Sequence, residues 1–270
     1  MPTDHELTGS DREAAAHEFY RHAMAALAAA GLPFLVGGAY AFAHYTGIAR
    51  DTKDFDLFVR RGDHAAALGA LGRAGYRVEL NFPHWLGKAH SGDCFVDLIF
   101  SSGNGLAPVD DLWFERAPPA EVLGLPVRLC PIEEMIWSKG FIMERERYDG
   151  ADVAHLLHSG AETIDWQHLV GRFGAHWRVL LSHLVLFGYI YPAAAGRIPK
   201  AVVEPLMARL AAEVENPDAV DPHCRGTVLS RAQYLSDVEA TGYRDGRLRP
   251  AGNMTPEEIE LWTEAIGREE

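Results

Sequence analysis

The sequence is poor in cysteine, in long apolar runs and in basic residues, and each shortage excludes a class of protein. Its three cysteines, Cys94, Cys130 and Cys224, are odd in number, far apart and without a Cys-x-x-Cys pair. That pattern excludes a disulfide framework and a cysteine-based zinc site. No apolar stretch approaches the length of a bilayer span, and the first residues are too polar for a signal peptide. We therefore expect a cytoplasmic protein with no membrane partner.

Acidic residues outnumber basic ones, 38 to 25, which gives a formal net charge of -13. Broad nucleic-acid binding needs Lys and Arg to neutralise phosphates, so this balance disfavours it and favours a small-molecule or protein partner. A local cluster of Arg145, Arg147 and Arg172 would still keep nucleic acid open as a partner.

Histidine is plentiful, but its spacing does not indicate a metal site. Two pairs at helical spacing, His155 with His158 and His176 with His183, lack the Glu of a His-Glu-x-x-His motif and any nearby cysteine. We interpret these histidines as surface or helix-capping residues.

The most informative segment is residues 34–59, in which a short apolar strand runs into Gly37-Gly38 and a helix-like stretch precedes a second strand. This second strand carries Asp54 and Asp56. Side chains alternate along a strand, so both carboxylates should project from the same face. Two like charges so close together favour a cation between them, and Mg²⁺ takes one or two carboxylates and completes its shell with water and substrate phosphates. The alternative is a solvated strand face or turn.

Gly37 and Gly38 lie at the expected junction between the first strand and the helix that follows it. Glycine leaves backbone N–H groups uncovered there, and the helix dipole favours an anion. A cation-binding carboxylate pair beside an anion-binding glycine pair suits a nucleoside triphosphate.

This order resembles the nucleotidyltransferase superfamily related to DNA polymerase beta, whose signature is Gly-Gly or Gly-Ser, a helix, and Asp-x-Asp. Arg50 and Thr52 resemble the arginine and threonine that precede the carboxylate pair in small bacterial members of this superfamily. Those members include antibiotic-modifying and toxin–antitoxin proteins. The resemblance implies ATP or another nucleoside triphosphate as substrate and Mg²⁺ (or Mn²⁺) as cofactor. Arg50 and Thr52 would then belong to the nucleotide site.

The resemblance also implies a third carboxylate on a neighbouring strand, and Asp97 is the candidate. It is the single charge in the apolar run of residues 94–100. An ionised Asp in such a strand needs a partner or a metal. The alternative is an edge-strand Asp that faces water. We predict that Asp54, Asp56 and Asp97 are the catalytic, metal-binding residues.

Relatives of this kind supply a Lys from the helix after the sheet and an Asp from the next helix, and Lys139 and Asp152 match these positions. Lys139 would offer its charge to a phosphate or pair with Asp152, with Asp149 as a helix cap. The alternative is an exposed Lys beside an Asp that stabilises a helix dipole. We place Lys139 and Asp152 in the predicted nucleotide site.

The expected fold class is α+β, a nucleotidyltransferase-like mixed sheet of about five strands with flanking helices, followed by an all-helical C-terminal part. Residues 1–130 would form the catalytic domain, with an N-terminal helix over 10–30 and a last strand near 121–129. Residues 131–270 would form a helical domain that makes the other wall of a cleft. Helices are expected near 131–146, 150–158, 165–173, 176–190, 200–214, 230–240 and 255–267. The helix over 176–190 is apolar nearly all round, so it would lie in the core or at a homodimer interface.

These observations favour a metal-dependent nucleotidyltransferase that transfers a nucleoside monophosphate to an acceptor hydroxyl and releases pyrophosphate. The acceptor is open: a small molecule, a protein or an RNA. The first alternative is a non-catalytic nucleotide- or partner-binding protein on the same fold, such as a toxin–antitoxin component. The second is a toxin that nucleotidylates RNA, which requires a basic groove beside Asp54.

Overall fold

The computed structural model describes residues 9–50, 52, 54–215 and 221–266. The chain divides into two compact units. Unit 1 comprises residues 1–41, 49–100 and 109–130, and unit 2 comprises residues 42–48, 101–108 and 131–270. Helix α2 (Gly38–Thr46) begins in unit 1 and ends in unit 2.

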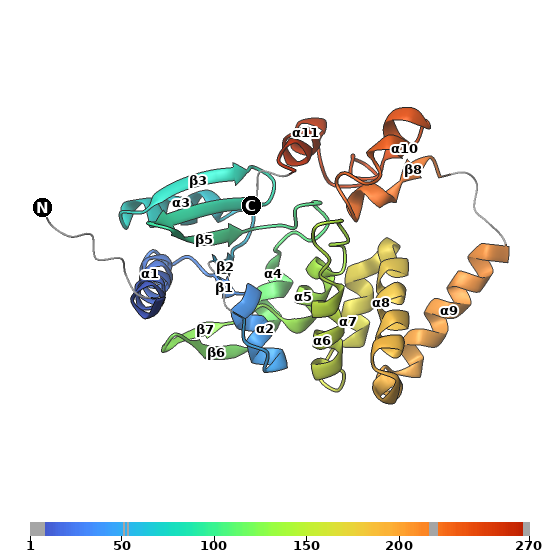
Figure 1. The fold of residues 1–270 in the computed structure, drawn as a ribbon, viewed down its shortest axis with the longest axis horizontal. Helices are drawn as coiled ribbons and strands as arrows, with labels where there is room; N and C mark the ends of the chain where they lie inside the picture. The colour runs from blue at the N-terminus through green and yellow to red at the C-terminus, as the bar shows by residue number, and fades with distance from the viewer. Residues whose placement is uncertain (1–8, 51, 53, 216–220, 267–270) are drawn as a thin grey trace, which may run out of the picture. The chain divides into compact units, whose positions relative to one another are not determined.

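The centre of unit 1 is a five-stranded mixed sheet (Figure 1) with the strand order β1-β2-β5-β4-β3. β2 and β5 pair in parallel, and the other neighbours pair antiparallel. The strands are β1 (Leu35–Val36), β2 (Asp54–Phe58), β3 (Arg77–Phe82), β4 (Leu86–Ser91) and β5 (Cys94–Ile99). The predicted α+β class and the size of the sheet are confirmed.

One face of this sheet forms the core of unit 1. Phe55 and Leu57 on β2 and Val96 and Leu98 on β5 are completely buried there. Tyr20 of α1 stacks on Phe55 with 4.7 Å between ring centroids. The helices of unit 1 are α1 (Gly9–Ala29), α3 (His64–Arg73) and α4 (Asp111–Arg116), and Figure 1 shows α3 along the sheet. The apolar residues at alternate strand positions therefore face helices, which leaves the other face for polar residues.

A two-residue turn at Gly92 and Asp93 joins β4 to β5, with Gly92 at a φ of +60°. Such a left-handed conformation suits glycine and matches the twist of a tight hairpin. The hairpin around this turn pairs Lys88 with Asp97.

The segment near 121–129 differs from the prediction of one strand that closes the main sheet. It forms a separate hairpin of β6 (Pro119–Val122) and β7 (Leu125–Arg128). The cause is the turn between them, where Leu123 and Gly124 both have positive φ, +53° and +76°. Leucine rarely adopts this conformation, so a turn at Leu123 is hard to predict from the residue types.

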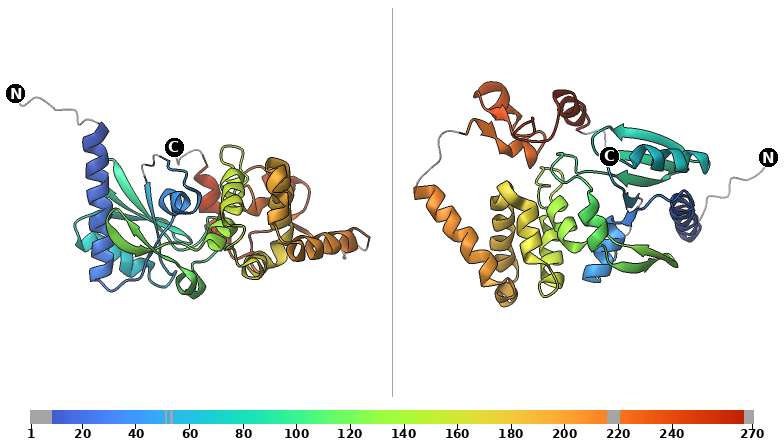
Figure 2. Two further views of the ribbon diagram at one scale, coloured as in Figure 1. Left: turned by 90° about the horizontal axis from the view of Figure 1, so that it is seen from below. Right: turned by 180° about the vertical axis from the view of Figure 1, so that it is seen from behind.

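Unit 2 is mostly helical. Helices α5 to α9 pack against one another (Figure 2, green to orange), and Leu156 of α6 and Leu180 and Phe187 of α8 lie in their common core. The helices are α5 (Ile132–Lys139), α6 (Gly150–Gly160), α7 (Trp166–Phe173), α8 (Trp177–Ile190), α9 (Lys200–Glu215), α10 (Leu235–Ala240) and α11 (Pro256–Glu264). Short 3-10 helices span Gly174–His176, Pro192–Arg197 and Arg225–Val228.

Three helices of unit 2 depart from expectation. α5 ends at Lys139 because Gly140 follows it and packs against Phe173, and an antiparallel bridge between Met143 and Tyr148 replaces the predicted continuation. α10 begins at Leu235, five residues later than predicted.

α8 is buried on one side only, and Tyr189 on its other side is 83% exposed. A homodimer that would cover this exposed side remains a prediction.

The C-terminal part also contains strands, which corrects the prediction that it is all helical. β8 (His223–Cys224) pairs in parallel with β9 (Arg244–Asp245). Asp245 and Arg247 form an ion pair beside these strands at 2.7 Å, with the Arg247 side chain completely buried. The pairing of β8 with β9 gives hydrogen-bond partners to backbone N–H and C=O groups in segments that have no apolar helical repeat.

Candidate active site

The three predicted carboxylates meet on the polar face of the unit 1 sheet. Asp54 and Asp56 project from the same face of β2 because they are two positions apart. The parallel register of β2 and β5 aligns Asp56 with Asp97. Each of the three residues has a carboxylate oxygen within 4.8 Å of the others. Within the described part of the chain, no other group of three or more His, Cys, Asp or Glu side chains comes together in this way.

Burial shapes the electrostatics of this group. The side chain of Asp97 is only 13% exposed, and this burial raises the pKa of its carboxyl above the usual range. The Lys88 ammonium, 3.0 Å from Asp97 Oδ1, opposes that rise, while Asp54 adds to it. Asp97 therefore does not face water freely, as the edge-strand alternative required.

The loop that precedes β2 orients the Asp54 side chain. The Thr52 hydroxyl donates a hydrogen bond to the Asp54 carboxylate and contacts the Asp54 carbonyl oxygen at 3.2 Å. Arg50 lies exposed two residues earlier in the same loop. Thr52 thus acts on the carboxylate itself, and a contact of Arg50 or Thr52 with a nucleotide remains a prediction.

Gly38 is the point at which helix α2 meets the carboxylates. A Cβ on Gly38 would lie 1.6 Å from Asp56 Oδ2, and the φ of Gly38 is +51°. Only glycine therefore permits the observed position of the Asp56 side chain. Gly38 is also the first residue of α2, and N–H groups in the first helical turn lack partners within the helix.

Gly37 has a different structural role from its neighbour. Its N–H donates to the Asp56 carbonyl oxygen at 3.0 Å, which extends the pairing of β1 with β2. A Cβ on Gly37 would also collide with the Phe58 ring at 2.3 Å. Because the Gly37 N–H is already used in this pairing, Gly38 is the glycine of the pair whose N–H is the candidate for binding a phosphate.

The residues of this group fit a hard divalent cation. Three carboxylates supply oxygen ligands, which Mg²⁺ prefers, and no thiolate or imidazole is among them. The donor set therefore suits Mg²⁺ or Mn²⁺ held by Asp54, Asp56 and Asp97.

The second predicted constellation lies within unit 2. Lys139, at the end of α5, places its ammonium 2.8 Å from Asp149 Oδ2 and 2.9 Å from Asp152 Oδ2. Arg147 also pairs with Asp149 at 3.1 Å, and these cations lower the pKa of the Asp149 carboxyl despite its burial. The pairing of Lys139 with Asp152 is present, and the role of both residues toward a nucleotide remains a prediction.

Lys88 is the site residue that the sequence analysis missed. A signal was present, because a hairpin turned at Ser91-Gly92-Asp93 determines which residues face each other. Counting back from that turn pairs Lys88 with Asp97.

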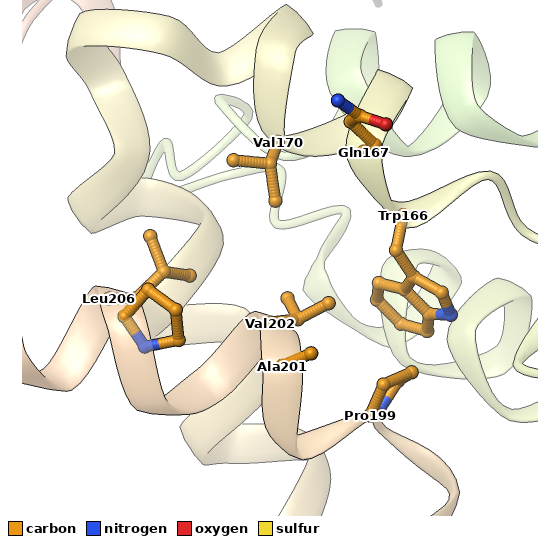
Figure 3. Close-up of a pocket in the computed structure, with 8 residues that line it drawn as sticks. Trp166, Gln167, Val170, Pro199, Ala201, Val202 and Leu206 are labelled. Atoms are coloured by element: carbon orange, nitrogen blue, oxygen red, sulfur yellow. The ribbon is translucent and has the colours of Figure 1, made fainter.

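An apolar cavity of about 430 Å³ lies between α7 and α9 in unit 2 (Figure 3). It is lined by Trp166, Gln167, Val170, Pro199, Ala201, Val202, Pro205 and Leu206. None of these side chains is ionisable, so the cavity offers no acid or base.

No helix in the described ranges has both the length and the apolar character needed to cross a membrane.

The carboxylates lie in the order that the sequence resemblance predicts. Gly37-Gly38 precedes α2, Asp-x-Asp lies on β2, and the third Asp lies on the adjacent parallel strand β5. The mixed five-stranded sheet with its flanking helices is consistent with the fold that the resemblance implies, and the acidic triad is consistent with a catalytic site.

Comparison with known proteins found no matching protein-family model and no matching curated protein. Among solved structures, the chain is similar to ANT(2")-Ia in complex with adenylyl-2"-tobramycin, with 19% identity, a TM-score of 0.38, and coverage of 65% of this chain and 98% of that one. It is also similar to the lincomycin-bound lincosamide antibiotic adenylyltransferase LnuA, with 13% identity, a TM-score of 0.38, and coverage of 52% and 94%. Terminal uridylyl transferase 4 from Trypanosoma brucei with bound CTP is 14% identical, with a TM-score of 0.33 and coverage of 95% and 89%. Because these scores are low, the function proposed below rests on the geometry of the carboxylates.

Proposed function

We propose that the protein is a metal-dependent nucleotidyltransferase that transfers a nucleoside monophosphate from a nucleoside triphosphate to an acceptor hydroxyl. The observation that carries the proposal is the meeting of three carboxylates beside the first residue of α2. A carboxylate group next to a helix N-terminus can hold a cation and the phosphates that the cation accompanies.

Each residue of the site would have a separate role in the proposed transfer. Asp54, Asp56 and Asp97 would hold the divalent cations, and the N–H of Gly38 would bind a phosphate oxygen. The acceptor oxygen attacks the α-phosphorus, the bond from the α-phosphorus to the bridging oxygen breaks, and pyrophosphate leaves. The acceptor proton passes toward the Asp97 carboxylate. Bound divalent cations supply charge stabilisation for the attacking and leaving oxygens.

Residues outside the carboxylate triad complete the proposal. Thr52 keeps the Asp54 carboxylate in place, and Arg50 would reach the triphosphate from the same loop. Lys139 and Asp152 would contribute to the nucleotide site from the helical unit, with Lys139 held between its two carboxylate partners until then. The acceptor would be a small molecule, a protein or an RNA that brings a hydroxyl group.

The decisive experiment measures label transfer. The full chain is incubated with each α-labelled nucleoside triphosphate, Mg²⁺ or Mn²⁺, and fractions of a cell extract, and pyrophosphate release is followed in parallel. Asp54→Asn and Asp97→Asn should lower transfer by more than the roughly 10–100-fold that loss of an outer-shell partner costs. Asp93→Asn is the matched control, because Asp93 is exposed in the hairpin turn beside β5.

Two results would contradict the proposal. Full transfer by Asp54→Asn and Asp97→Asn would remove the carboxylates from the chemistry. Tight nucleotide binding that is indifferent to Mg²⁺ and releases no pyrophosphate would favour the non-catalytic binding protein instead.

A further inference from the structure

Lys88 occupies a position on the carboxylate face that the proposed reaction does not use. It lies on β4 directly opposite Asp97, and Asp97 in turn lies opposite Asp56. Residues directly opposite on neighbouring strands project from the same face. The three side chains therefore form one row across three strands, with the cation of Lys88 next to the Asp97 carboxylate.

The Lys88 side chain is held on two sides. Its Nζ lies 3.0 Å from Asp97 Oδ1 and 4.0 Å from the centre of the Phe95 ring. Only 22% of the side chain is exposed. A partly buried ammonium between a carboxylate and an aromatic face is strongly localised, unlike a surface lysine.

The next residue of the row does not compete for Lys88. Glu79 lies opposite Lys88, and its carboxylate accepts hydrogen bonds from His90 at 2.8 Å and from Asn81 at 3.1 Å. Glu79 is therefore satisfied by other groups, and Lys88 forms its ion pair with Asp97.

This pairing has a consequence for cation binding. A buried carboxylate without a partner is costly, so Lys88 stabilises Asp97 when no metal is present. A divalent cation at the same carboxylate would meet the positive charge of Lys88 at short range and be repelled by it. The triphosphate of a nucleotide brings the negative charge that would offset this repulsion.

We propose that Lys88 is the resident counter-ion of Asp97, which positions this carboxylate in the metal-free protein and weakens divalent-cation binding until a nucleotide arrives. The inference rests on the proposed function, because it takes Asp54, Asp56 and Asp97 as the cation site. It makes Lys88 a positioning residue that couples loading of the cation to loading of the nucleotide.

The test compares the wild-type full chain with Lys88→Met, Lys88→Gln and Lys88→Arg, first without nucleotide and then with a nucleoside triphosphate present. Thermal unfolding in EDTA measures the stabilisation of Asp97, and calorimetric titration with Mn²⁺ measures cation affinity. Lys88→Met should unfold at a lower temperature in EDTA and yet bind Mn²⁺ about tenfold more tightly, because the repelling charge is gone. Lys88→Gln should show the same tighter binding with a smaller loss of stability, since its amide can still donate to Asp97.

Three controls separate this role from a merely structural one. Lys88→Arg keeps the charge and should restore wild-type stability and affinity. Lys200→Met removes an exposed lysine at the start of α9 and should change neither quantity. Adding Asp97→Asn to Lys88→Met should abolish the gain in affinity, since the two residues act on each other.

The outcomes distinguish this inference from the proposed function. Tighter Mn²⁺ binding combined with lower stability in EDTA supports the counter-ion role. If Lys88→Met and Lys88→Gln bind Mn²⁺ as the wild type does, or only weaken nucleotide binding, the counter-ion role is overturned while the cation site stands. If the wild type and both variants fail to bind Mn²⁺ with or without nucleotide, the cation site and the proposed function fail together.

Discussion

Substitution of Gly38 by alanine provides a sharp test of the site geometry. The added Cβ would lie 1.6 Å from Asp56 Oδ2, a separation that no relaxation of the methyl group alone can relieve. The neighbouring Asp56 Cγ, at 2.6 Å, is also too close. The Asp56 carboxylate therefore has to leave its position for the variant to fold.

The expected size of the effect has two parts. Placing an L-residue at the positive φ of Gly38 costs about 1–2 kcal/mol, which lowers the melting temperature by roughly 3–6 °C in a protein of this size. Displacement of Asp56 acts on the cation instead. Unit charges about 4 Å apart attract by about 4 kcal/mol at a typical effective dielectric, so losing half of this contact weakens cation binding roughly thirtyfold.

Gly31→Ala is the matched control. Gly31 also has a positive φ, +68°, but nothing lies within 4 Å of its would-be Cβ. Both variants should lose similar stability by thermal unfolding, whereas only Gly38→Ala should lose Mn²⁺ affinity by calorimetry and transfer activity. Wild-type Mn²⁺ affinity in Gly38→Ala would refute the assignment of Asp56 as a ligand held against α2.

Two further predictions concern a local hydrogen bond and a buried histidine. Thr52→Val should weaken Mn²⁺ binding roughly tenfold in calorimetry, because the Asp54 carboxylate loses its hydroxyl donor, whereas Thr52→Ser should not; equal affinities would exclude the orienting role. Burial lowers the pKa of His183, whose ring nitrogen lies 2.8 Å from the Gly140 carbonyl oxygen, so the folded protein resists a proton that the unfolded chain accepts below about pH 6.5. The free energy of unfolding measured in urea should thus fall as the pH drops below that value, and it should fall less in His183→Gln; identical pH slopes would contradict this.

Much of the carboxylate site is predictable from local sequence because strand geometry is periodic. Asp54 and Asp56 share a face simply because two residues complete one strand repeat. Asp97 stands out because a single charge in an apolar run requires a partner. The turn around Gly92 marks a hairpin, and the α+β class follows from the change from strand-like to helix-like patterns near residue 131.

Other features depend on which segments meet, and no local pattern contains that information. The turn at Leu123 uses a conformation that leucine seldom adopts, so one predicted strand became a separate hairpin. The sequence predicts a phosphate or Asp152 as the partner of Lys139, and the fold also brings Asp149 within 2.8 Å of it. The buried pair of Asp245 and Arg247 lies at short strands in a part of the chain where no strands are predicted.

Residue types and their spacing specify the chemistry available to this protein: three carboxylates, a glycine pair before a helix, and strands on which these groups repeat. The parallel pairing of β5 with β2, which places Asp97 beside Asp56, follows only from the folded chain. The same holds for the contact of Gly38 with Asp56 and for the position of Lys88 opposite Asp97. Residue types and strand periodicity are local properties, whereas strand order and register follow from burying one face of the whole sheet.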